Sequence, residues 1–254
     1  MRTLIAAALL VAGVAVAQAG PLDDMLAFDT VYIPALSLTG TGGKDAASAA
    51  RADAAMKRLV DSWPDQRGRL QAVWPGDADW SKRLDAVQRD LVAAQAAVQR
   101  RDWTAAHEAL EPVRITLMQA RQARGVSYYV DRLTAFHAPM ESLAQAGATL
   151  RPEQLTAARR ASLDQTYAQA RALWLEVERD PADARSLQLD AARERQWREA
   201  LADETRALSR LSQALRSDDG AALLQAAAAV KPPFARAFTS LGRAPDAAAP
   251  LAAH

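Results

Sequence analysis

Residues 102–147 read DWTAAHEALEPVRITLMQARQARGVSYYVDRLTAFHAPMESLAQAG and contain the clearest structural and chemical patterns in the chain. Apolar residues recur every three or four positions on both sides of Arg124-Gly125, which is the spacing of amphipathic helices. Asp102 is placed to cap the first helix, and Gly125 suits a left-handed residue at its end. The stretch therefore predicts two helices joined by a short turn.

Each histidine in this stretch is followed four residues later by a glutamate: His107 by Glu111, and His137 by Glu141. Residues four apart lie one turn apart on the same side of a helix. In an antiparallel pair of helices, each histidine would be level with the glutamate of the other pair, so the four side chains are expected to converge. Imidazole and carboxylate groups bind Zn, Fe, Mn and Cu as divalent ions. We therefore predict a His2Glu2 site for a divalent transition metal on this helical hairpin.

A metal-free arrangement of the same residues is the alternative. Arg114 lies on the same stripe and could pair with Glu111 or Glu141, which would leave a polar seam satisfied by hydrogen bonds and an ion pair. Pro112 and Pro139 each remove a helical hydrogen bond near the site, and the bends they introduce could aim the ligands or spoil their register.

Haem is a third possibility for this stretch. The chain has no cysteine, so covalent c-type attachment through C-x-x-C-H is excluded. Non-covalent haem held by His107 or His137 together with Met118 or Met140 is chemically reasonable. A methionine on an apolar stripe is more commonly part of the core, which weakens this reading.

The rest of the chain predicts an all-α helical bundle of about eight helices. Half of the residues are hydrophobic, only 6% are aromatic and only 11 are glycine, a composition that favours packed helices. Stretches containing Pro and Gly at 62–70 and 73–79 predict a linker, and GTGG at 40–43 predicts a helix connector. The predicted helical segments begin or extend at 22–38, 45–63, 79, 102, 129, 152–179 and 186–216, with a last one from 218 that Pro232-Pro233 interrupt.

A loose internal repeat suggests two related four-helix halves, at 20–125 and 126–242. Residues 91–114 resemble residues 208–231, where Leu224 and Ala228 stand in place of His107 and Glu111, so a single site is expected. The Ala- and Pro-rich tail at 243–254 is expected to be disordered.

The first 19 residues predict a secretory signal peptide. A basic start at Met1-Arg2 precedes an apolar run, and Ala17-Gln18-Ala19 places small residues before a cleavage site at Gly20. Export to a bacterial periplasm and no membrane span after cleavage are therefore expected. A net charge of +1 without long runs of one sign gives no indication of nucleic-acid binding.

These patterns together predict a periplasmic helical bundle that binds a divalent transition metal for metal handling or structure. Catalysis is less expected, because four protein ligands can close the coordination shell. The main alternative is a metal-free helical interaction module that docks an envelope protein partner, and non-covalent haem binding is the third.

Overall fold

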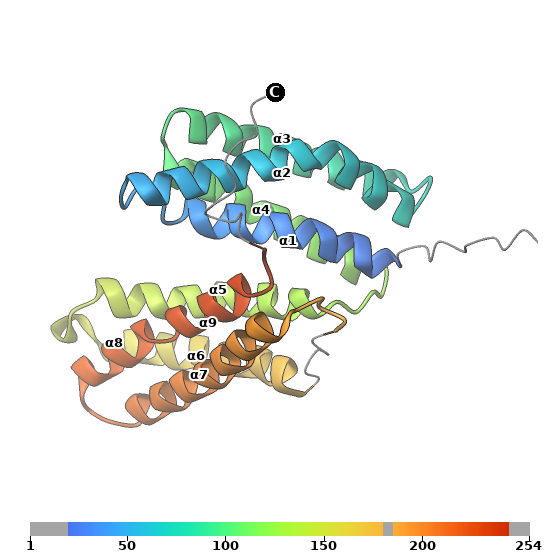
Figure 1. The fold of residues 1–254 in the computed structure, drawn as a ribbon. Helices are drawn as coiled ribbons and strands as arrows, with labels where there is room; N and C mark the ends of the chain where they lie inside the picture. The colour runs from blue at the N-terminus through green and yellow to red at the C-terminus, as the bar shows by residue number, and fades with distance from the viewer. Residues whose placement is uncertain (1–19, 180–184, 244–254) are drawn as a thin grey trace, which may run out of the picture.

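The structure, a computed structural model, describes residues 20–179 and 185–243, and its regular elements in those ranges are all helical (Figure 1). The elements are α1 (Pro21–Thr39), α2 (Ala46–Val73), α3 (Ala78–Gln99), α4 (Trp103–Gln122), α5 (Tyr129–Thr149), the short 3-10 helix η1 (Pro152–Gln154), α6 (Ala157–Arg179), α7 (Ala191–Leu215), α8 (Gly220–Ala228) and α9 (Lys231–Thr239). The all-α prediction is confirmed. None of the described helices is both long and apolar enough to cross a membrane. The predicted signal peptide, and the predicted tail after Arg243, lie outside the described residues.

Helix ends follow the local sequence closely. The Asp102 side chain accepts a hydrogen bond of 3.0 Å from the Ala105 backbone N–H at the start of α4. Gly125 has φ +66°, the left-handed conformation that its place after the helix requires. The cap of α3 is Asp77 rather than Asp79, with a hydrogen bond of 2.9 Å from the Trp80 N–H.

The predicted linker at 62–70 is wrong, because α2 continues through Pro64 to Val73. Trp63 before this proline and Leu70 after it are both buried, and the indole N–H of Trp80 donates to the Leu70 carbonyl at 2.7 Å. Burying two large side chains contributes several kcal/mol, which offsets the hydrogen bond that Pro64 removes. Only the stretch after Val73 turns the chain.

Two layers of helices face one another, with α1–α4 in one and α5–α9 in the other (Figure 1). The chain passes between them in the connector 123–128, where the predicted halves meet. One contiguous cluster of buried apolar side chains includes residues from every α-helix, so the layers share a core. That the halves arose by duplication stays a prediction.

In this arrangement the two helices that were predicted to pack as a hairpin are separated. Helix α4 packs mainly against α3, and α5 mainly against α6 and α8, while α4 and α5 make few contacts with one another. The His–Glu pairs therefore face each other across the interface between layers, and not along a tight pair of helices.

A buried polar group fixes the connector between the layers. Tyr128 donates from its hydroxyl to Asp29 of α1 at 2.7 Å, while Arg121 of α4 binds Asp131 of α5 through two hydrogen bonds of 2.9 and 2.5 Å. Burial raises the pKa of Asp29 to about 6, although Arg121 and the Tyr128 hydroxyl act in the opposite direction. These four side chains tie both layers to the turn that joins them.

The segment 240–243 ties the layers a second time, because it leaves α9 and reaches α1. Pro34 lacks the N–H that would bind the Thr30 carbonyl in a regular helix. The Arg243 backbone N–H donates to that carbonyl instead, at 2.8 Å. Gly242 approaches Pro34 so closely that a Cβ at this position would lie 2.7 Å from the proline Cδ. We call this contact the C-terminal clasp.

The close approach of α5 and α8 at Gly147 gives the first prediction. A Cβ there would lie 2.3 Å from the Ala228 backbone nitrogen and 2.5 Å from the Leu224 carbonyl oxygen, so backbone would have to move. We expect Gly147→Ala to lower the free energy of unfolding by about 1–3 kcal/mol, measured by urea denaturation.

Gly68→Ala is the matched control, because Gly68 is also helical and a Cβ there meets nothing within 4 Å. This substitution should raise the stability by about 1 kcal/mol through helix propensity. Equal stabilities of the two variants would contradict the close packing of α5 on α8.

Candidate functional site

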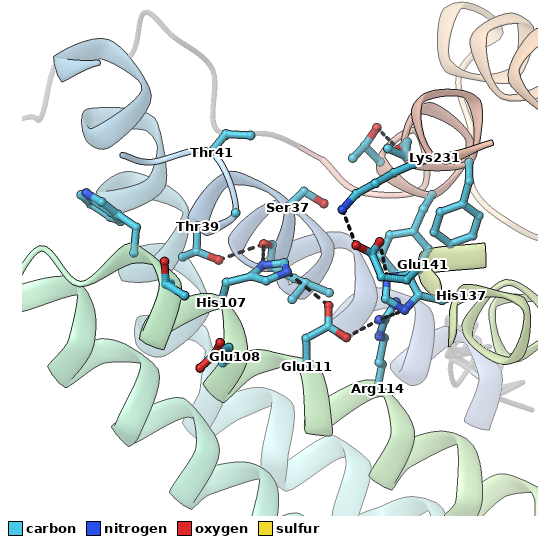
Figure 2. Close-up of a pocket in the computed structure, with 18 of the residues that line it drawn as sticks. Ser37, Thr39, Thr41, His107, Glu108, Glu111, Arg114, His137, Glu141 and Lys231 are labelled. Atoms are coloured by element: carbon cyan, nitrogen blue, oxygen red, sulfur yellow. Dashed lines mark hydrogen bonds and ion pairs between the residues drawn. The ribbon is translucent and has the colours of Figure 1, made fainter. Parts of the chain in front are cut away.

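A cavity of about 950 Å³ lies between the two layers. Its walls come from the end of α1 with the GTGG connector, from α4, from α5 and from α9. His107, Glu111, His137 and Glu141 all line it (Figure 2). The four residues singled out from the sequence therefore share one cavity.

His107 is held in one orientation by backbone. Its Nδ1 lies 2.8 Å from the carbonyl oxygen of Leu36, an acceptor, so Nδ1 carries the proton. In the neutral imidazole, Nε2 then keeps its lone pair, and it lies 3.4 Å from Oε1 of Glu111 (Figure 2). A backbone carbonyl that fixes one ring nitrogen while the other is left for an ion is the usual support of a metal-binding histidine.

Arg114 stands at the centre of the site. Its side chain is only 6% exposed, and its Nη2 donates both to Oε2 of Glu111 and, at 2.6 Å, to Nδ1 of His137 (Figure 2). The guanidinium also lies 5.7 Å from the centre of the Phe238 ring. The pairing of Arg114 with Glu111 that the sequence offered as an alternative is thus present.

The contact with Arg114 determines the state of His137. A guanidinium only donates, so Nδ1 of His137 accepts and the proton of the neutral ring sits on Nε2. Burial, followed by the charges of Arg114, Lys231 and His107, lowers the pKa of His137 to about 3. His137 is therefore neutral at physiological pH, and its one lone pair is engaged.

Glu141 turns towards the rim of the cavity. Its Oε1 accepts a hydrogen bond of 2.7 Å from Lys231 at the start of α9, and its Oε2 lies 4.0 Å from Nε2 of His137. This Oε2 is buried without a hydrogen-bond partner among the described residues. Lys231 was missed by the sequence analysis, because nothing in the local pattern relates it to a glutamate 90 positions earlier.

The predicted alignment of the two His–Glu pairs is observed for one of the two expected cross-pairs. Glu111 and His137, expected to be level, meet at the same guanidinium, whereas no contact joins His107 to Glu141. In residues 20–179 and 185–243, no three His, Cys, Asp or Glu side chains lie close enough together to hold a metal ion. The separation of α4 from α5 explains this, since Arg114 fills the space between the two pairs.

Small residues bring the GTGG connector close to the site. A Cβ at Gly40 would lie 3.2 Å from the His107 ring, and one at Gly42 would lie 2.6 Å from the Trp103 ring. The connector can rest against both aromatic rings only because these positions lack side chains. The GTGG stretch predicts a connector, and its three glycines in four residues are the feature of the sequence that points to a close approach.

The separation of His107 from Glu111 has a chemical consequence. Two donors that bind one ion at about 2.1 Å and at the tetrahedral angle lie about 3.4 Å apart. The distance between Nε2 of His107 and Oε1 of Glu111 is 3.4 Å. Comparison of the chain with family models, with curated proteins and with solved structures finds no match, so this geometry has to be interpreted on its own.

Replacing Arg114 tests the proposed state of His137. In Arg114→Met the buried charge and donor are lost, so we expect the pKa of His137 to rise from about 3 towards the ordinary value of 6.5, as measured by NMR titration. A depressed folded-state pKa stabilises the fold above the pKa of the unfolded chain, and this stabilisation is lost as the pH falls from about 6.5 towards 3. The variant should lose less stability over that range.

Arg114→Lys serves as the control, because it keeps a positive charge beside the imidazole. Its His137 should remain closer to the low pKa of the wild type. An unchanged pKa in Arg114→Met would mean that burial alone neutralises the ring and that the guanidinium does not contact it.

Proposed function

We propose that the cavity binds a divalent transition metal and that the protein handles or delivers such an ion. His107 and Glu111 are the two ligands that the geometry supports best, with Arg114 orienting the Glu111 carboxylate from behind. The wider His2Glu2 set, in which Arg114 yields and His137 and Glu141 join, is the second form of this proposal.

One observation carries the proposal. In a ring whose single proton is on Nδ1, Nε2 of His107 and Oε1 of Glu111 would face each other at 3.4 Å as two acceptors. Two acceptors in that position repel unless a cation or a proton lies between them. Their separation equals the edge of a tetrahedral site at first-row metal bond lengths.

The alternatives find less support. Haem iron would need a histidine lone pair; that of His137 is engaged by Arg114, which leaves His107 as the only one of the two histidines with a ring nitrogen for haem. Met140 lines the cavity but is 1% exposed and belongs to the apolar core. A docking module needs a contiguous apolar patch, whereas the large exposed hydrophobic side chains of the described residues come from four different helices. These side chains are Leu22, Val92, Ile115 and Leu175.

Periplasmic export is part of the proposal. Helix α1 begins at Pro21, with Gly20 as its N-terminal cap residue, immediately after the predicted cleavage site. A signal peptidase would therefore cut ahead of the first helix without disturbing it. Intact-mass measurement of protein from a periplasmic extract should give a chain that begins at Gly20, and a retained Met1 would contradict export by this route.

Calorimetric titration of the purified chain with Zn²⁺ tests the metal site. We expect one ion per chain in the wild type, and a loss of affinity of more than about 100-fold in His107→Ala and in Glu111→Gln. Glu108→Gln is the matched control, because Glu108 lines the same cavity on the same helix and is not one of the proposed ligands.

His137→Gln separates the two forms of the proposal. With two protein ligands, the variant should lose no more than about 10–100-fold, the effect expected of a residue behind the ligands. A loss as large as that of His107→Ala would establish the four-ligand set in its place. Wild-type protein without a saturable site for Zn²⁺, Co²⁺ or Mn²⁺ would overturn metal binding altogether.

A further inference from the structure

The cavity is much larger than a bare ion requires. A water molecule takes up about 30 Å³, so an ion with a few waters fills only a small part of the 950 Å³ between the layers. Sites for organic ligands commonly enclose about 300–1,000 Å³. The volume therefore matches an ion that arrives together with an organic molecule.

The coordination shell is also incomplete. His107 and Glu111 supply two donors, whereas first-row ions take four to six. No third His, Asp or Glu among the described residues lies near enough to join them. Between two and four positions on the ion are therefore left to a ligand that the protein does not supply.

The charges of the lining favour an anion as that ligand. The formal charges of Lys44, Arg114 and Lys231 balance those of Glu108, Glu111 and Glu141. A divalent ion would add two positive charges to this balanced set. Such an excess is unfavourable where protein replaces water, and an anionic ligand removes it.

The walls of the cavity also suit the parts of an anionic organic ligand that do not bind the ion. Apolar side chains from α4, α5 and α9 line the cavity, and Lys44 makes no ion pair within the described part of the chain. The apolar contributors are Trp103, Met140, Phe234 and Phe238. Lysine ammonium groups at the rim and apolar walls below suit carboxylate groups on a small organic body.

Building on the metal site proposed above, we propose that the protein takes up its ion as a chelate with a small polydentate carboxylate. The chelator fills the positions that His107 and Glu111 leave open, Lys44 and Lys231 bind its carboxylates, and its carbon skeleton packs against the apolar wall. Arg114 holds Glu111 in place for the ion.

Nickel nitrilotriacetate is a suitable probe, because the chelator occupies four of the six positions on Ni²⁺ and leaves two adjacent positions for protein donors. Protein without an affinity tag is titrated with Ni²⁺ alone, with nitrilotriacetate alone and with the preformed complex. We expect the complex to bind about tenfold more tightly than Ni²⁺ alone, which is what two partly exposed ion pairs can supply. His107→Ala should abolish binding of the complex.

Lys44→Gln combined with Lys231→Gln should remove the advantage of the complex, while the affinity for Ni²⁺ alone should not fall, because two positive charges leave the cavity. Lys57→Gln is the control, since Lys57 pairs with Asp61 on α2 and does not line the cavity. Equal or weaker binding of the complex, or an advantage that survives the double substitution, would overturn the chelate proposal while the metal site stands. Failure of both Ni²⁺ and the complex to bind would remove the metal site as well.

Discussion

A guanidinium that is buried away from water needs hydrogen-bond acceptors from the protein. The acceptors of Arg114 organise the centre of this protein. Its Nη2 donates to acceptors from both layers, Glu111 on α4 and His137 on α5, while its Nε is buried without a hydrogen-bond partner among the described residues. The same contacts make Glu111 a fixed carboxylate and His137 a neutral ring. His107 is oriented separately, by the carbonyl of Leu36. The cavity thus has hydrogen-bonded side chains on one side, with Nε2 of His107 and Oε1 of Glu111 3.4 Å apart beside them.

Much of the fold could be predicted from the sequence because its determinants are local. Asp102 and Gly125 mark the ends of α4 through capping and a positive φ, and both act within a few residues. The error at 62–70 has the opposite cause. Pro64 is a local signal for a break, but burial of Trp63 and Leu70 against distant helices outweighs it. Burial of large side chains in tertiary packing outweighs the low helix propensity of a proline.

The candidate site, like the fold, could be predicted from the sequence only where its determinants are local. Spacing identified the His–Glu pairs, because residues four apart meet on any helix. It could not place α4 and α5 in different layers, nor bring Lys231 to Glu141. Glu204 is a further example of a feature that the local sequence does not predict. Its sequence context is that of an exposed helical residue, yet it is fully buried, and burial raises its pKa to about 9 although the Phe234 backbone and the charge of Arg236 act in the opposite direction.

The C-terminal clasp limits how the molecule can move. The layers are joined at the connector near Tyr128, and again where Arg243 donates to the carbonyl that Pro34 leaves without a helical donor. Two attachments far apart in the sequence oppose a jaw-like swing of one layer from the other. The cavity between the layers is therefore expected to keep its width as long as both attachments hold.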